Sequence, residues 1–568
     1  MLFKMNRIYT TITLLTLVLT ISSCEDFLTE TPSSGYNRDT YFESTEKADM
    51  AILGIMSSIS DYNHYGEYEM AMPTSDDMHF SSRTQTDSKI NDISHYLYTS
   101  TNDWIEYLWK YKYEGINRAN TAVLGIENME DFESDPQLQH LSGEARFLRA
   151  FLTFDLIKYW GEVPYSTTPS TQYNDLFRAR VSHDDLYDIV IDDLSKAAEQ
   201  IQWAADGVSP ERATQGAARA LLMRVLLQRA GYWLAPDGTF NRPTSSERRQ
   251  LYNKVIEQWM AFQDNGYHGF YPGGFGQLFK DVSGLVLNSK ENIWEIAMYQ
   301  DQGRRNGSAW GIYNGPVVAA PSGLSTTEDA NYMGRAQGFL LVVPEWYDFY
   351  EEVDERRDIS ICTYRYQWDT NNKEHVKQER QRNSWYVGKW RREWMPVGQA
   401  NKNMNYGDVN FCPLRYSDVV LMAAEAYNEL GETAQAWNLI NLVRQRAGAT
   451  PLSTANYDRF LGRNLALMPV NRFIDDGSEQ GKIRVVLYFE RGLELGFELQ
   501  RKYDLIRWGV LDKALKLFGE RTSVNTSTTT PYPAFRNFIH GQHELFPIPL
   551  KEMQSNFSLN GINNNGFN

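Results

Sequence analysis

Few side chains in this sequence are placed for covalent chemistry, and one cysteine stands out by its position. The chain has 568 residues and 3 cysteines. Cys24 ends an apolar run near the N-terminus. Cys362 and Cys412 lie far along the chain without C-x-x-C spacing, so neither a zinc site nor a disulfide framework is indicated. These two cysteines form either one bond or two free buried thiols.

Motifs of nucleophilic, metal-dependent and phosphate-binding catalysis are missing. The sequence has no H-E-x-x-H, no G-x-S-x-G and no phosphate-cradling glycine loop. It also has no D-x-D-x-D-G calcium loop, although its many acids leave a calcium site open. A glycoside hydrolase needs only two carboxylates, about 5–9 Å apart, and the chain has 72 Asp and Glu residues. The sequence therefore predicts no cofactor, no metal and no catalytic residue, with a carboxylate-pair enzyme as an alternative.

The position of Cys24 is explained by its surroundings, the stretch "LTISSCEDFLTETPSSGY". Lys4 and Arg7 give a short basic start, and the uncharged run that follows is shorter than the roughly 20 apolar residues of a membrane span. This pattern is typical of a secretory signal, and its end, Ile21-Ser22-Ser23-Cys24, resembles a bacterial lipobox. Residues 1–23 are therefore predicted to be a lipoprotein signal peptide. Residues 24–36 are predicted to be an acylated cysteine and a polar tether.

Acylation has a physical consequence. Buried methylenes each contribute about 0.8 kcal/mol, and more than one chain gives stable anchoring. The only membrane contact predicted for this chain is therefore the lipid on Cys24.

The composition excludes some partners and singles out one residue class. The formal net charge is −16, which argues against nucleic-acid binding, because that needs basic patches. Aromatic residues make up 13%, with 15 Trp and 34 Tyr. Many of these stand in Gly/Asn/Asp-rich, non-periodic stretches where no simple core face accounts for them.

Helical periodicity dominates the rest of the chain. One predicted helix covers residues 182–201, with Ser182 as its N-cap. Another runs from Tyr416 to Leu430 and ends at Gly431. A third follows at once and stops near Gly448. Two helices joined by a tight turn, with small residues where the helices approach each other, are typical of tetratricopeptide-like units.

The predicted fold class is mainly α. Tetratricopeptide-like helical hairpins form a cradle, with a long irregular loop-rich insertion and little β structure. Residues 37–568 are predicted to be a single domain, with a helical scaffold at about 37–260 and 411–530 and an irregular segment at about 261–410. The alternative is an irregular α-bundle without a repeat.

Four stretches, in order, resemble one family over nearly the whole mature chain. They are "EARFLRAFLTFDLIKYWGEVPY", "LRYSDVVLMAAEAYNELGETAQAWNLINLVRQRAG", "ERGLELGFELQRKYDLIRWG" and "HELFPIPLKEM". Behind a lipobox, this set resembles the SusD-like (RagB-type) nutrient-uptake lipoproteins of Bacteroidetes. One departure is Leu499, where the family usually has Gly; we expect it on a helix.

The charged residues of these stretches are predicted to be scaffold, because an unpaired buried charge is prohibitive. Arg146 and Arg149 are expected to pair with Asp or backbone carbonyls. An interhelical ion network is expected among Glu490, Glu494, Glu498, Arg491 and Arg501. Asp354 and Arg357 are expected to lock a corner.

The resemblance implies glycan capture without catalysis, and hence flat rings and hydroxyl-binding side chains on loops held by a rigid scaffold. Two regions qualify, residues 74–104 and 298–315. The candidate ligand-binding residues are Asp76, Asp77, Arg83, Tyr96, Tyr98, Asn102, Trp104, Tyr299, Arg305, Asn306, Trp310 and Tyr313. Core packing is the alternative for Tyr96 and Trp104. For Trp310 and Tyr313, in a loop with several glycines, the binding interpretation is preferred.

The implied function is that of a cell-surface lipoprotein of the outer membrane. It would capture an oligosaccharide or polysaccharide and deliver it to a SusC-like TonB-dependent transporter. Glu25 and Asp26 after Cys24 resemble the surface-export signal of such lipoproteins. The alternatives are a surface glycoside hydrolase on an all-α scaffold and a tetratricopeptide-type protein-binding adaptor.

Overall fold

The computed structural model describes residues 41–80, 89–300, 305–321, 331–396, 405–458, 476–521 and 533–567. Cys24 and Arg83 lie outside these residues. The chain divides into two compact units, residues 1–47 and 48–568. Within the second unit, helices carry most of the described structure, and the strands are only two to six residues long. The prediction of a mainly α fold with little β structure is confirmed.

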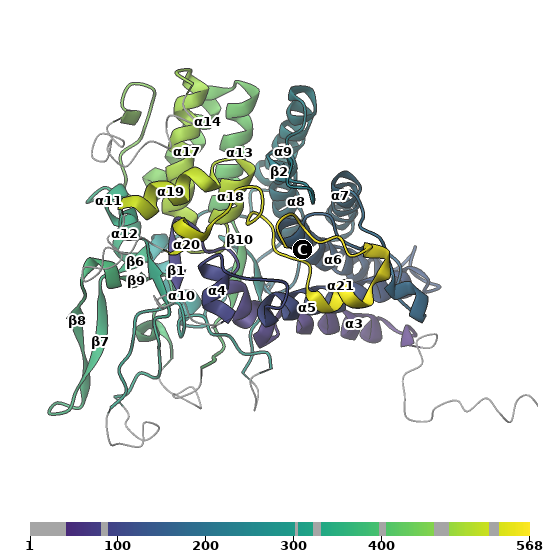
Figure 1. Ribbon diagram of the computed structural model, residues 1–568, viewed down its shortest axis with the longest axis horizontal. Coiled ribbons are helices and arrows are strands. Elements are labelled where there is room, and N and C mark those ends of the chain that lie inside the picture. Colours follow the sequence, from purple (N-terminus) through teal and green to yellow (C-terminus); the bar gives the residue numbers. More distant parts are fainter. Residues whose placement is uncertain are drawn as a thin grey trace, which may run out of the picture. The chain divides into compact units, whose positions relative to one another are not determined.

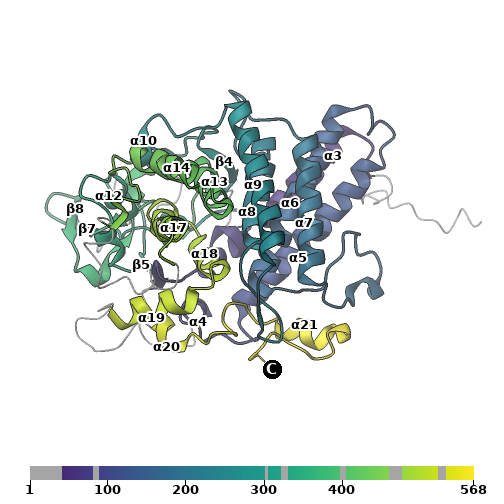
Figure 2. The same cartoon turned by 90° about the horizontal axis from the view of Figure 1, so that it is seen from above.

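One group of helices is built in chain order. Each helix packs against the next, and the group lies side by side in Figures 1 and 2. Its members are α5 (Asp103–Glu127), α6 (Pro136–Trp160), α7 (His183–Gln200), α8 (Gln215–Arg229) and α9 (Ser245–Asn265). Side-chain caps start these helices: Asn102 accepts from two backbone N–H groups of α5, and Ser182 accepts from Asp185 N–H at 3.2 Å.

A second group holds the helical hairpin that the sequence predicts at residues 416–448. Helix α13 ends at Gly431, whose φ of 90° lies in the left-handed region that favours glycine. Helices α14 and α17 pack on α13, and α13 also packs on α9, which joins the two groups. The members are α13 (Tyr416–Leu430), α14 (Thr433–Arg446), α17 (Glu479–Leu495), α18 (Arg501–Arg507) and α19 (Leu511–Arg521).

The remaining helices are short or lie at the edges of these groups. They are α3 (Thr45–Ile59), α4 (Lys89–Ser94), α10 (Gly274–Ser283), α11 (Trp346–Phe349), α12 (Arg356–Ser360), α20 (Pro533–Asn537) and α21 (Leu550–Ser555).

The strands form small sheets. The largest has the order β1-β5-β9-β6, with β1 (Met78–Phe80), β5 (Leu340–Val342), β9 (Tyr386–Val387) and β6 (Ile361–Cys362). The described residues also form three two-stranded pairs. They are β10 (Phe411–Arg415) with β4 (Asn292–Ile296), β2 (Trp233–Leu234) with β3 (Phe240–Asn241), and β7 (Tyr364–Asp369) with β8 (Glu374–Glu379).

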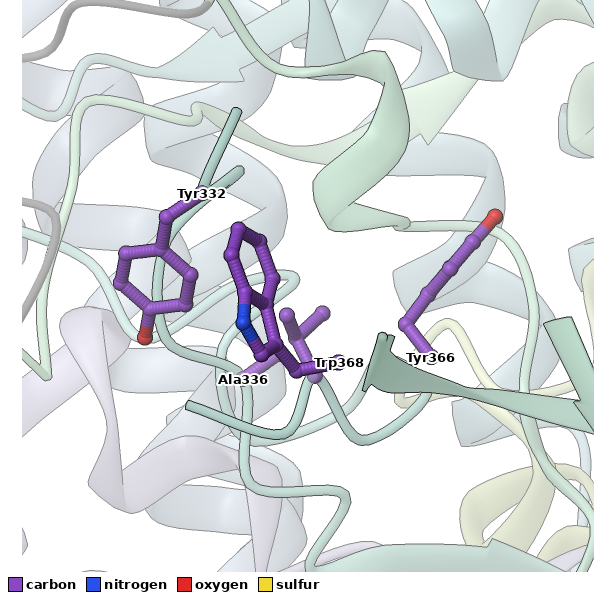
Figure 3. Close-up of a cluster of buried hydrophobic side chains, with 5 residues drawn as sticks. Tyr332, Ala336, Tyr366 and Trp368 are labelled. Atoms are coloured by element: carbon purple, nitrogen blue, oxygen red, sulfur yellow. The ribbon is translucent and has the colours of Figure 1, made fainter. Parts of the chain in front are cut away.

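Part of the aromatic content of the middle segment forms a core of its own. Trp368 and Tyr366 of β7 pack with Tyr332, Ala336 and Val318 in one buried cluster. The ring of Trp368 lies between Tyr332 and Tyr366 (Figure 3). Tyr366 and Trp368 alternate with polar residues along β7, as in a half-buried strand, whereas Tyr332 lies outside any helix or strand and its burial is not readable from spacing.

Helix α17 lies at the centre of a buried ion network. Glu494 binds Arg415 at 3.1 Å and Arg356 at 3.2 Å, and it also binds Arg446. Glu490 binds Arg356 at 2.7 Å and Arg444 at 2.6 Å. Burial alone would raise the pKa of Glu494, but Arg446, Arg415 and Arg356 outweigh it and hold this pKa below its ordinary value. The five residues of the predicted network are all buried in ion pairs, but their partners lie outside that set: Glu498 binds Arg415, Arg491 binds Asp418 and Asp504, and Arg501 binds Asp76.

Two local expectations are wrong. Asp354 binds Arg356 at 2.8 Å, whereas Arg357 pairs with the exposed Asp358. Leu499 does not lie on a helix: it stands between α17 and α18 with a φ of 68°. Left-handed backbone favours glycine, which explains in physical terms why a glycine suits this position.

We predict that Glu494→Gln lowers the free energy of unfolding by about 3–5 kcal/mol, because it leaves buried arginines without their carboxylate. Urea unfolding at neutral pH measures this. A group with a lowered folded pKa stabilises above its unfolded pKa, and that stability is lost as the pH falls. The difference from wild type should therefore shrink below pH 4.5, the ordinary glutamate value.

The matched control is Asp192→Asn on α7, which removes an exposed ion pair with Lys196. It should leave the urea midpoint unchanged. A Glu494→Gln midpoint equal to that of the control would contradict the central role of the network.

Candidate ligand-binding surface

A short turn between α3 and β1 carries aromatic side chains at both of its ends. The turn contains η2 (Tyr62–Gly66) and η3 (Tyr68–Met70). We call the rings attached to it the aromatic surface: Tyr62, Tyr68, Trp104, Tyr107, Tyr313 and Tyr406. Trp104, in the first turn of α5, stacks on Tyr68 with ring centroids 3.8 Å apart and planes at 5°. Tyr107, one helical turn on, meets Tyr68 edge-on and is 41% exposed.

The other end of the turn is made by three tyrosines. The hydroxyls of Tyr62 and Tyr313 lie 3.5 Å apart, and Tyr406 packs edge-on against Tyr62. Tyr62 is buried, whereas Tyr313 and Tyr406 are half-buried. Tyrosines in this setting offer ring faces together with hydroxyl groups, which suits a ligand with apolar faces and polar edges.

Backbone contacts fix the turn against the second predicted region. Tyr62 N–H donates to the carbonyl of Arg305 at 2.7 Å, and Ala309 N–H donates to the carbonyl of Gly66 at 2.7 Å. A Cβ on Gly66 would lie 2.5 Å from the carbonyl oxygen of Gly307. The residue at 66 must therefore be glycine for the two segments to approach this closely.

Charged groups flank Tyr62. Asp61 caps η2 by accepting from Asn63 N–H at 2.9 Å. Burial raises the pKa of the Asp61 carboxyl, against the lowering effects of the Asn63 hydrogen bond and of His64 and Arg305. Arg305 itself is exposed. Asp61 is a buried cap, whereas the exposed Arg305 can bind the hydroxyl edge of a ligand that stacks on the rings.

The structure brings part of the predicted set to the surface. Trp104 and Tyr313 belong to the aromatic surface, and Arg305 lies beside it. Tyr299 is 68% exposed and, with the half-buried Asn306, borders a largely apolar cavity of about 250 Å³ beside α3. The Asn306 amide donates to Ser60 Oγ at 3.0 Å. Tyr62, Tyr68, Tyr107 and Tyr406 are further members that the sequence did not predict, although "DYNHYGEYEM" gives Tyr62 and Tyr68 the same signal of rings beside a glycine.

The structure corrects the prediction for two acids and three aromatic residues. Asp76 is fully buried and binds Arg501 at 2.8 Å, and Asp77 accepts from Phe497 N–H at 3.0 Å. Burial, and then the neighbouring Asp76, raise the pKa of Asp77 to about 6. The hydroxyls of Tyr96 and Tyr98 donate to the backbone carbonyls of Thr74 and His543.

Trp310 is the clearest correction. It is 1% exposed, stacks on Phe411 with centroids 4.4 Å apart, and donates from Nε1 to the Tyr65 carbonyl at 3.1 Å. Its Gly-rich loop is a turn that folds inward. Asn102 is likewise a buried cap, because its side chain accepts from Trp104 N–H at 3.0 Å. These residues shape the loops and offer no accessible face.

One cluster of potential metal ligands is already occupied by a cation of the chain. His64, Glu69 and Asp155 bring ligand atoms within 4.8 Å of one another. The Lys112 ammonium lies among them, 3.0 Å from His64 Nε2 and 2.9 Å from Asp155 Oδ2, and it also binds Glu69. The lysine supplies the positive charge that a metal would bring. Cys362 and Cys412 are both free thiols.

The described residues thus define an α-helical protein with an aromatic surface and no helix that has the length and apolar character of a membrane span. Residues 290–567 match a family model described as the SusD family. Residues 26–227 match a model described as "Starch-binding associating with outer membrane". The chain belongs to the SusD-like family.

Individual relatives agree over almost the full length. SusD-like protein P2 of Formosa agariphila is 25% identical over 563 residues, covering 96% of this chain and 98% of that protein. A SusD homolog from Bacteroides thetaiotaomicron shares the fold with a TM-score of 0.74, at 24% identity, over 93% of this chain and 98% of that one. Surface glycan-binding protein A of the same organism, solved with laminarihexaose, has a TM-score of 0.65 at 20% identity, over 92% and 99%.

We predict that Trp310→Ala lowers the free energy of unfolding by about 3–5 kcal/mol, as removal of a buried tryptophan leaves a cavity. Chemical unfolding followed by circular dichroism measures the change. Tyr299→Ala is the control, because that ring on the same stretch is 68% exposed and should leave stability unchanged. Equal stability of the two variants would contradict the assignment of Trp310 to the core.

Proposed function

We propose that this protein is a cell-surface lipoprotein that captures oligosaccharide on the aromatic surface and delivers it to a SusC-like TonB-dependent transporter of the outer membrane. The observation that carries this proposal is the Trp104–Tyr68 stack beside the exposed Tyr107. Membership of the SusD-like family and the laminarihexaose held by a protein of the same fold support a glycan as the ligand.

The physical case starts from the shape of a sugar. A pyranose has an apolar face of C–H groups, which packs on a flat ring, and hydroxyl edges, which need hydrogen-bond partners. Trp104 is held flat by its stack on Tyr68, and Asn102 fixes the start of its helix, so the ring is preorganised. The exposed Arg305 lies against the other end of the same turn.

Binding without turnover is part of the proposal. A surface glycosidase would release new reducing ends from a glycan panel, whereas a capture protein leaves the glycans intact. A protein-binding adaptor would show no retardation in gels that contain polysaccharide.

We predict that Trp104→Ala weakens glycan binding by about 1–3 kcal/mol, in the range of a hot-spot ring. Affinity gels and calorimetry with laminarin, starch and xylan measure the loss, and Trp104→Tyr should retain most of the binding because it keeps a ring. The control is Trp203→Ala, a half-buried ring that contacts Phe262, far from the turn in the sequence. Unchanged binding by Trp104→Ala would contradict the assignment of the aromatic surface as the glycan-binding site.

The membrane role depends on Cys24. We predict that Cys24→Ala moves the protein from the membrane pellet to the soluble fraction, because the acyl chains are lost. Fractionation with immunodetection measures this. Purification of a tagged wild-type protein from membranes in mild detergent should bring a TonB-dependent β-barrel with it. A variant that stays in the pellet of cells lacking the partner transporter would contradict lipid anchoring, and a wild type that purifies alone would contradict the transporter partnership.

A further inference from the structure

A second ligand site is suggested by a cavity of about 840 Å³, which lies between α5, the segment 164–178 and α21. We call it the α5–α21 pocket. Its size is within the range of small-molecule binding sites, about 300–1,000 Å³. None of its lining residues belongs to the aromatic surface.

Helix α5 contributes residues to both the aromatic surface and the α5–α21 pocket, from a different face for each. Trp104, Tyr107 and Tyr111 are spaced three and four residues apart, and all three have ring contacts with the turn at Tyr68 and His64. Trp109, Tyr113 and Asn117 are each four residues apart, so they share another face of the helix, and they line the α5–α21 pocket. Five residues separate Trp104 from Trp109, which is about 140° around a helix. The two sets of rings therefore lie on different sides of α5.

The far wall of the pocket is fixed to α5 before any ligand arrives. The Asn120 amide donates to the carbonyls of Ser166 at 2.9 Å and Thr168 at 3.2 Å. Ser170 N–H donates to Asn117 Oδ1 at 2.9 Å, and the Tyr113 hydroxyl donates to the Pro164 carbonyl at 2.5 Å. A prebuilt wall reduces the entropy lost on binding.

Aromatic rings stand at the open side of the pocket. Tyr173 lines it, is 74% exposed and meets Phe177 edge-on with centroids 4.8 Å apart. Phe177 in turn stacks on Phe557, which is 70% exposed. Large rings held in water at the edge of a cavity are typical of binding sites.

The charges of the lining indicate a neutral ligand. Four carboxylates and three cations nearly balance: Glu106, Glu114, Asp175 and Glu552 against Lys110, Arg178 and Lys551. Several are already engaged within the protein. Lys551 binds Glu106 at 2.5 Å, and the Asp175 carboxylate accepts from Gln172 N–H at 2.9 Å. An anionic or cationic ligand would find little uncompensated charge here.

Polar atoms suited to hydroxyl groups remain in the wall. Glu552 accepts from the Asn556 amide at 2.9 Å, and burial raises the pKa of its carboxyl. A hydroxyl that donates to this half-buried carboxylate would replace hydration that it lacks. Flat rings, a polar wall and balanced charge are together the chemistry that recognises a saccharide.

We infer that the α5–α21 pocket is a second binding site for a neutral saccharide, so that one molecule holds a glycan at two points. The ligand class rests on the proposed function, but the location does not. Two sites on one rigid scaffold raise the apparent affinity for a long glycan above that for a short one, because the second contact is intramolecular.

The test compares Tyr173→Ala, Trp104→Ala and the double variant. Calorimetry uses laminarihexaose, maltohexaose and xylohexaose, and affinity gels use laminarin, starch and xylan. Wild type should bind two hexasaccharides, each single variant one, and the double variant none. Retention of the polysaccharide should fall at least about tenfold in Tyr173→Ala. Tyr173→Phe should behave as wild type, since it keeps the ring.

Met260→Ala is the control, because that apolar side chain is 53% exposed on α9, outside both sites. If Tyr173→Ala retains the wild-type stoichiometry and gel retention, the second site is wrong while the proposed function stands. If binding is lost only in Tyr173→Ala, the α5–α21 pocket is supported and the aromatic surface is not. A wild type that binds none of the six probes overturns both.

Discussion

The buried charges around α17 and α18 are the constraint on which the rest of the structure depends. Asp76, Arg356 and Arg415 come from distant parts of the sequence, and each ends in an ion pair with one of these helices or with the break between them. Removing charges from water is costly, so each pair is stable only when all its partners are in place. That requirement makes the positions of β1, α12 and β10 interdependent. It fixes irregular backbone that has few ladder hydrogen bonds of its own.

Lys112 is the centre of a second buried ion cluster, which lies beneath the turn that carries part of the aromatic surface. Its ammonium joins Glu69 of the turn, Asp155 of α6 and His64, and all four side chains are buried. Burial alone would raise the pKa of Asp155, but Lys112 and Lys158 outweigh it and hold this pKa below its ordinary value. The turn that carries Tyr62 and Tyr68 is thus tied by charge to two long helices. A loop held in this way presents its rings with little freedom to lose on binding.

Periodicity and capping were enough to predict the helices, because they are local. Ser182 and Gly431 mark helix ends through their own side chain or backbone, and the structure confirms both. The candidate site was harder, because glycines beside aromatic residues predict turns but not their direction. Trp310 turns inward onto Phe411, whereas Trp104 stays half-buried on Tyr68. That difference depends on contacts such as Gly66 against Gly307, between residues about 240 positions apart, and no local pattern records them. The prediction that Leu499 lies on a helix failed for a related reason, because the backbone conformation of this residue is set by the break between two helices.

Helix α5 is held by both kinds of constraint. Its buried residues anchor it to α6, and Lys112 points into the ion cluster, so the helix cannot shift without breaking both. Its remaining faces carry Trp104 with Tyr107 on one side and Trp109 with Tyr113 on the other. A ligand that spans both faces would therefore meet rings whose separation is set by a single rigid element. Such a scaffold favours a long, repetitive ligand over a compact one, because only a repeating chain offers the same chemical surface at two fixed points.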